Sequence, residues 1–84
     1  MAAEDTNIVA LVETLVTELV DEPDAVQVAA REEGDSLVVE IQVAPDDVGK
    51  VIGRQGRIIK SIRTLARAAS TYYGDRPVEV EVVG

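Results

Sequence analysis

The chain has 84 residues, with 16 acidic and 8 basic side chains, and its formal net charge is −8. Histidine and cysteine are both absent, which excludes disulfides, thiolate metal sites and the commonest general base. The length fits one small domain, and no apolar run approaches the roughly 20 residues of a membrane span. We therefore expect a cytoplasmic single domain with no metal, no cofactor and no membrane partner.

A helix is predicted near the N-terminus, because apolar residues recur at the i, i+3, i+4, i+7 spacing of one helical face. These residues are Ile8, Leu11, Val12, Leu15, Val16 and Leu19. Asp5 or Thr6 is expected to cap the start of the helix. Pro23 is expected to prevent its continuation.

Two strands are predicted next, because apolar and other residues alternate with period two. The inward positions are Val26, Val28 and Ala30 in the first strand and Leu37, Val39, Ile41 and Val43 in the second. Residues 32–35 between them are typical of a hairpin turn. A third alternating segment, 78–82, predicts a last strand that is entered through residues 74–77.

Two helices are predicted between the second and third strands. Asp46 or Asp47 is expected to cap a short helix that places Val48, Val51 and Ile52 on one face. Gly53 is expected to end this helix in a left-handed conformation. A long helix then runs from near Gly56 to about Tyr73. The predicted order is helix, strand, strand, short helix, long helix, strand.

The net charge is distributed very unevenly along the chain. Residues 1–47 carry 13 acidic residues and one basic residue, whereas residues 48–74 carry six basic residues and no acidic one. Residues 75–84 add a balance of −2. Such an asymmetry indicates contact with a polyanion through the basic segment, although the total charge alone would argue against it.

The basic segment contains glycines that could approach a phosphate. Neither the G-x-G-x-x-G fingerprint of dinucleotide-binding proteins nor the Walker A pattern fits Gly49, Gly53 and Gly56. The sequence Gly53-Arg54-Gln55-Gly56 does fit the G-x-x-G turn that clamps single-stranded nucleic acid. A plain tight turn between two helices, with solvated arginines, is the alternative interpretation.

Phosphate chemistry suits this turn. Glycines let the backbone approach an anion, and the amides and dipole at the start of the long helix favour negative charge there. Arg54 and Arg57 could add charge-assisted hydrogen bonds, and Gln55 could donate to phosphate or sugar oxygens. Lys50, one helical turn earlier, is within plausible reach of the same strand.

Apolar residues at fixed offsets surround the turn, in the pattern Val51-Ile52-Gly53-Arg54-Gln55-Gly56-x-x-Ile59-x-x-Ile62. This pattern resembles the signature of the KH domain family. Residues 47–53 and 62–65 look like the small bacterial single-KH RNA-binding proteins of the KhpA type. The resemblance covers about residues 6–83, and its centre is residues 46–65.

The resemblance implies an α+β fold consisting of a single type II KH-like domain over residues 1–84, structured over 6–83. Its expected order is α-β-β-α-α-β, with a three-stranded sheet and helices packed on one face. It also implies a single-stranded RNA-binding protein that acts as a post-transcriptional regulator or RNA chaperone. The expected RNA-binding residues are Lys50, Val51, Ile52, Gly53, Arg54, Gln55, Gly56, Arg57, Ile59 and Lys60. Val51, Ile52 and Ile59 would line an aliphatic base groove, although Ile52 and Ile59 fit equally well as core residues.

The long helix has three predicted stripes. The core stripe is Ile59, Ile62, Ala66, Ala69 and Tyr73, and the basic stripe opposite is Arg57, Lys60, Arg63 and Arg67. Ile58, Leu65 and Tyr72 flank the core stripe, where they either widen the buried face or form an exposed seam for a partner. The resemblance implies a homodimer, a heterodimer with a larger KH-containing protein, or both.

Two other function classes were weighed against RNA binding. A protein-interaction adaptor, with a KH fold that does not bind RNA, would use the acidic N-terminal half for its contacts. An enzyme is not supported, because no catalytic residues cluster in a recognisable pattern. Single-stranded DNA remains an alternative ligand, since no residue is assigned to read a 2′-hydroxyl.

Overall fold

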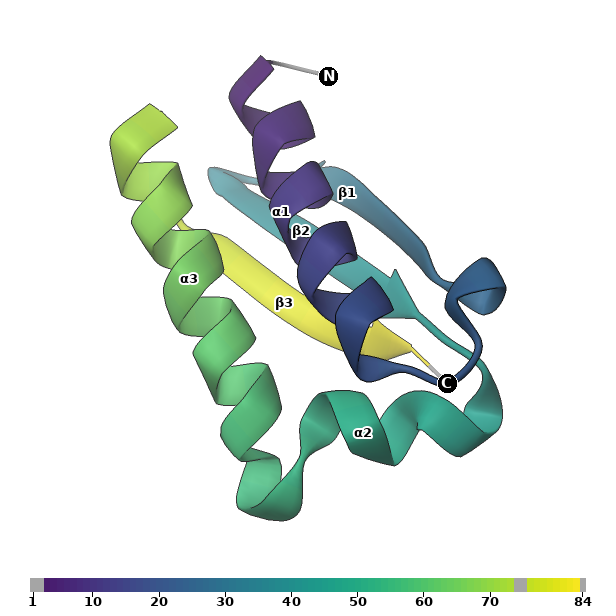
Figure 1. The fold of residues 1–84 in the computed structure, drawn as a ribbon. Coiled ribbons are helices and arrows are strands. Elements are labelled where there is room, and N and C mark those ends of the chain that lie inside the picture. Colours follow the sequence, from purple (N-terminus) through teal and green to yellow (C-terminus); the bar gives the residue numbers. More distant parts are fainter. Residues whose placement is uncertain (1–2, 74–75, 84) are drawn as a thin grey trace.

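A computed structural model of the chain describes residues 3–73 and 76–83. In it, three helices lie against one face of a three-stranded sheet (Figure 1). The elements are α1 (Ala3–Leu19), β1 (Gln27–Glu33), β2 (Ser36–Gln42), α2 (Val48–Ile52), α3 (Arg57–Tyr73) and β3 (Val78–Val83). Single 3₁₀ turns at Pro23–Ala25, Pro45–Asp47 and Arg54–Gly56 join them. The predicted α+β class and the order α-β-β-α-α-β are confirmed.

The sheet is mixed, with strand order β1-β2-β3. β1 and β2 pair antiparallel from Gln27↔Gln42 to Glu33↔Ser36, and β2 and β3 pair parallel from Leu37↔Val78 to Gln42↔Val83. The hairpin turn is shorter than expected, because the ladder continues to Glu33 and leaves only residues 34 and 35 unpaired. The parallel pairing requires a long crossover, which α2 and α3 supply.

The core is aliphatic and lies between the sheet and the helices. It contains Ile8, Val12, Val16, Leu37, Val39, Ile41, Val43, Val51, Ile59, Ile62, Ala66, Val78 and Val80. The predicted inward positions of the second strand are therefore buried, as are Ile8, Val12 and Val16 of α1. The other predicted positions are only half-buried, namely Leu11, Leu15 and Leu19 in α1 and Val26, Val28 and Ala30 in and before β1. Burial of this apolar surface is the main force that holds the helices on the sheet.

Two details differ from the expected pattern. Val38 is buried on the other face of the sheet, where it lies in register between Arg31 and Glu79. Ser70 is buried in α3 and its hydroxyl donates to the Arg76 carbonyl at 2.5 Å, whereas its neighbour Ala69 is half-buried. The side chain of Tyr73, and residues 74–75 at the predicted entry to the last strand, lie outside the described residues.

The predicted start of the first helix is wrong. The helix already includes Ala3, so Asp5 and Thr6 lie within it rather than at the N-cap position. It ends at Leu19, and Pro23 opens the next 3₁₀ turn, as a proline at a first helical position does.

Two arginines of the predicted basic stripe contact the edge of the sheet. β3 is an edge strand, and α3 runs beside it (Figure 1). The Nε atoms of Arg63 and Arg67 donate to the carbonyls of Val80 and Val78, each at 3.3 Å. An uncovered strand edge is a template for pairing with another chain. The two arginines occupy edge carbonyls that such a strand would use.

Replacing both arginines, as Arg63→Ala/Arg67→Ala, should therefore promote association through β3. We expect faster aggregation in static light scattering. The free energy of unfolding should decrease by less than about 1 kcal/mol for each lost hydrogen bond. Arg54→Ala/Arg57→Ala is the matched control, because it removes the same charge away from the strand. Equal aggregation of both double variants would contradict the edge-covering role.

Candidate nucleic-acid interface

The turn between α2 and α3 has a backbone that glycine makes possible. Gly53 has φ 75° and ψ 172°, Gln55 has φ 56° and ψ 25°, and Gly56 has φ 72°. The expected left-handed termination at Gly53 is therefore correct in φ, but its ψ is extended, in a region populated almost only by glycine. Residues 53–56 separate the end of α2 from the start of α3, and the chain changes direction between the two helices (Figure 1).

Gly53 is also required by packing. A Cβ at this position would lie 2.5 Å from Cγ1 and 2.9 Å from Cβ of Ile58. Ile58 itself packs against the core, so it cannot easily move away. A Cβ at Gly56 would cause no such clash, since its nearest neighbour, Cγ2 of Ile59, would lie 3.9 Å away. The positive φ of Gly56 alone favours glycine.

Some of the amides expected to face a phosphate are already used within the turn. The Gly56 amide donates to the Gly53 carbonyl at 3.1 Å, and the Arg57 amide donates to the Arg54 carbonyl. Within the ranges 3–73 and 76–83, no backbone acceptor is found for the amides of Arg54 and Gln55. These two, at the tip of the turn, are the backbone donors best placed for an incoming anion.

Three basic side chains surround the tip without an acidic partner. Arg54, Arg57 and Lys60 are exposed, and none of them forms an ion pair with a described acidic residue. Arg57 donates to the Gln55 side-chain carbonyl at 3.2 Å. The turn and the first helical turn of α3 therefore carry three uncompensated positive charges beside the positive end of the helix dipole.

Lys50, which was also expected to face RNA, has acidic partners instead. Its Nζ lies 3.2 Å from Oδ1 of Asp47 and 3.2 Å from Oδ2 of Asp21. The hydrogen bond to Asp47, followed by that to Asp21, raises the pKa of Lys50. The positive charge of Lys50 is thus balanced within the protein.

The predicted cap at Asp46 or Asp47 is only partly correct, because Asp47 occupies the N-cap position of α2 without capping it. Asp47 makes no side-chain cap hydrogen bond to α2. Its buried carboxylate instead accepts hydrogen bonds from the backbone amides of Asp21 and Glu22, at 3.2 and 3.0 Å. Burial alone would raise the pKa of Asp47, but the two amides and Lys50 outweigh it and the pKa is lowered. The hydrogen bonds and the ion pair of Asp47 therefore stabilise the fold at pH values above the ordinary pKa of a carboxyl group. This stability is lost as the pH falls through the lowered pKa of Asp47.

The aliphatic residues expected to line a base groove differ in exposure. Val51 and Ile59 are buried in the core, and Ile52 is half-buried. Of the three, Ile52 therefore presents the most surface to a ligand.

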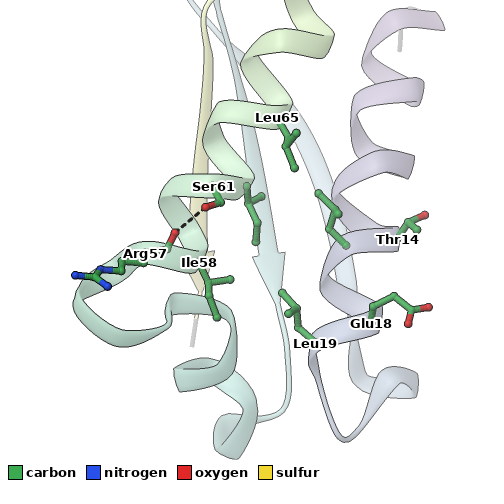
Figure 2. Close-up of a pocket in the computed structure, with 9 residues that line it drawn as sticks. Thr14, Glu18, Leu19, Arg57, Ile58, Ser61 and Leu65 are labelled. Atoms are coloured by element: carbon green, nitrogen blue, oxygen red, sulfur yellow. Dashed lines mark hydrogen bonds between the residues drawn. The ribbon is translucent and has the colours of Figure 1, made fainter.

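An apolar groove separates α1 from α3 (Figure 2). It has a volume of about 420 Å³, and Ile58 and Leu65 of the expected seam line it together with Leu15 and Leu19 of α1. Leu65 is 46% exposed, whereas Tyr72 is 82% exposed and does not line the groove. The α1 side of this groove was missed, because both leucines were assigned to the buried face of their helix.

Neither a metal-binding cluster nor a membrane-spanning helix is found among residues 3–73 and 76–83. Within the part of the chain that the structure describes, no three acidic residues gather in a way that could hold a metal ion. No helix in the same ranges has the length and hydropathy to cross a bilayer.

Comparison with known proteins identifies the family. The model of the KhpA/KhpB KH domain matches residues 9–82. The chain belongs to this family. RNA-binding protein KhpA of Clostridium acetobutylicum is 49% identical over 73 residues, which cover 87% of this chain and 96% of the relative. RNA-binding protein KhpA of Streptomyces coelicolor is 48% identical over 71 residues, which cover 84% of this chain and 85% of the relative.

Solved structures share the fold of this KH domain. Era of Aquifex aeolicus superimposes with a TM-score of 0.67 and 24% identity, over 99% of this chain and 33% of Era. A structure of Era with a nucleotide and a segment of 16S ribosomal RNA gives a TM-score of 0.64 and 26% identity, over 90% of this chain and 30% of Era. The chain thus spans about a third of the length of Era.

Two glycines of the KH domain offer a matched test of the turn. Gly53→Ala should lower the free energy of unfolding by about 3 kcal/mol, because it combines positive φ with the clash at Ile58. Gly49→Ala lies in α2 with no atom near its Cβ and should raise that free energy by about 0.5 to 1 kcal/mol. Urea unfolding measures both. Similar values for the two variants would contradict the packing requirement at Gly53.

Proposed function

We propose that this KH domain binds single-stranded RNA, with the RNA backbone held at the turn of residues 53–56. The observation that carries the proposal is the turn itself, where an open backbone and three basic side chains with no acidic partner among the described residues meet the start of a 17-residue helix. Two findings support it. The curated relatives are named RNA-binding proteins, and Era, which shares the fold, is found bound to ribosomal RNA.

Each part of the turn has a distinct role in this proposal. A phosphate approaches Gly53 and Gly56 and accepts hydrogen bonds from the backbone amides of Arg54 and Gln55. The Arg54 and Arg57 guanidinium groups add charge-assisted hydrogen bonds, and Lys60 holds the next phosphate along α3. Since no Phe or Trp is present, the bases rest on aliphatic surface such as Ile52 rather than on a stacking platform.

The charge distribution limits where RNA binds. The acidic residues of the N-terminal half repel the phosphate backbone from most of the surface, while the basic segment attracts it. Binding by one domain is then local, oriented and of modest affinity. We assign the protein to post-transcriptional regulation or RNA chaperone activity in the bacterial cytoplasm.

Binding to a short oligouridine, measured against salt concentration, tests this function. The native protein should show a log–log slope of about −0.7 for each phosphate contact. Arg54→Asp/Gln55→Asp should abolish binding and leave the circular dichroism spectrum unchanged, because both side chains are exposed. Glu13→Gln/Asp35→Asn, at two exposed acidic residues away from the turn, is the control, and it should retain binding. A native protein that binds no RNA at low salt would contradict the proposal and favour an adaptor function.

We also propose that the groove between α1 and α3 receives another KH domain, in a homodimer or with a larger KH-containing protein. The exposed Leu65 beside Ile58, Leu15 and Leu19 supports it, since apolar surface of this kind marks contact sites. A dimer would join two weak RNA sites and raise their joint affinity.

Leu65→Asp should therefore halve the mass measured by analytical ultracentrifugation, because a carboxylate in the groove is costly to bury. Tyr72→Asp is the matched control, since Tyr72 is exposed and lies outside the groove. An unchanged mass for Leu65→Asp, with unchanged partner binding, would contradict this interface.

A further inference from the structure

A buried carboxylate connects the end of α1 to the start of α2. Asp47 is 1% exposed, and the amides that it accepts belong to residues 26 and 25 positions earlier in the chain. Lys50 closes the arrangement from the other side, where it pairs with both Asp47 and Asp21 and donates to the Asp46 carbonyl at 3.4 Å. Two consecutive amides and one ammonium group thus converge on a single carboxylate.

This cluster lies at the opposite end of α2 from the turn at 53–56. α2 spans only Val48–Ile52, and its last hydrogen bond runs from the Gly53 amide to the Gly49 carbonyl at 2.9 Å. Figure 1 shows α2 crossing one end of the helical layer, between the chain that follows α1 and the start of α3. An element of five residues has few contacts of its own, so the fixed contacts at its start act together with the buried Val51 to determine where its end lies.

We propose that Asp47 and Lys50 are positioning residues, which hold α2 and the turn at 53–56 in the geometry that binds RNA, and that Lys50 contacts no phosphate. The part of this inference that concerns RNA affinity rests on the proposed function, whereas the positioning of α2 and the turn does not. If Lys50 turned to a phosphate, the buried Asp47 carboxylate would lose its cation, which opposes that movement. The lowered pKa of Asp47 and the raised pKa of Lys50 agree with a stable pair.

Asp21 contributes in a different way from Asp47. Its backbone amide reaches Asp47, while its own carboxylate is a largely exposed partner of Lys50. An exposed ion pair adds little stability. Removal of the Asp21 side chain therefore leaves the central contact in place, and Asp21→Asn should behave like the native protein.

The experiment compares two pairs of variants with equal charge changes. Lys50→Gln is matched by Arg54→Gln, and Asp47→Asn is matched by Asp46→Asn, whose side chain is exposed. Each is measured for oligouridine affinity against salt, and for hydrogen exchange without RNA of the Gly53, Gly56 and Arg57 amides, which are hydrogen-bonded at the turn. Lys50→Arg, which keeps the charge and the pairing, completes the set.

We expect Asp47→Asn and Lys50→Gln each to weaken binding about fivefold, with faster amide exchange in the turn and an unchanged salt slope. The double variant Asp47→Asn/Lys50→Gln should bind RNA no more weakly than either single variant, because both substitutions disturb the same contact. Arg54→Gln should instead reduce the slope by about 0.7 and leave exchange unchanged. Lys50→Arg and Asp46→Asn should match the native protein.

Two outcomes would overturn the inference. One is a slope reduction in Lys50→Gln equal to that in Arg54→Gln with native exchange, which would make Lys50 a phosphate contact. The other is native exchange in Asp47→Asn. Should Asp47→Asn fail to fold, Lys50→Gln carries the same test, because its side chain is 40% exposed. If the native protein binds no RNA, the proposed function fails, while amide exchange still decides the positioning role.

Discussion

The approach of Gly53 to Ile58 is the constraint on which the rest of the candidate site depends. With no Cβ at residue 53, the chain can leave α2 at positive φ and turn directly into α3. Ile58 is then anchored in the core, and the first residues of α3 are fixed relative to the turn. The same missing side chain that permits this packing also leaves the backbone open to a phosphate. One contact thus serves both the fold and the proposed binding.

Charge is arranged around this turn by pairing rather than by composition. Lys50 belongs to the basic segment, yet Asp21 and Asp47 balance it, and Arg63 and Arg67 are directed to the carbonyls of β3. The other three cations of the basic segment are Arg54, Arg57 and Lys60, and they have no acidic partner within the described residues. The six positive charges of the segment are therefore not equivalent, and those nearest the turn's tip and the start of α3 are the most available to an anion.

Local patterns predicted the fold well, because the helical and strand periodicities of Ile8–Leu19 and Val39–Ile41 reflect burial on one face. The turn could be predicted too, since Gly53 and Gly56 flank it in sequence. The partners of Asp47 could not, because an aspartate before a helix is usually a cap, and the amides that donate to this carboxylate lie 26 and 25 residues earlier in the chain. For the same reason the groove, which needs α1 and α3 side by side, was only half predicted.

The most direct test of RNA binding at the turn is an NMR titration of the native protein with a short oligouridine. The amides of Arg54 and Gln55, which have no backbone acceptor among the described residues, should show the largest shift changes, followed by those at the start of α3. Residues of β1, on the far edge of the sheet from α3, should remain unchanged. Shift changes centred on α1 or β1, with residues 53–60 unaffected, would contradict the account.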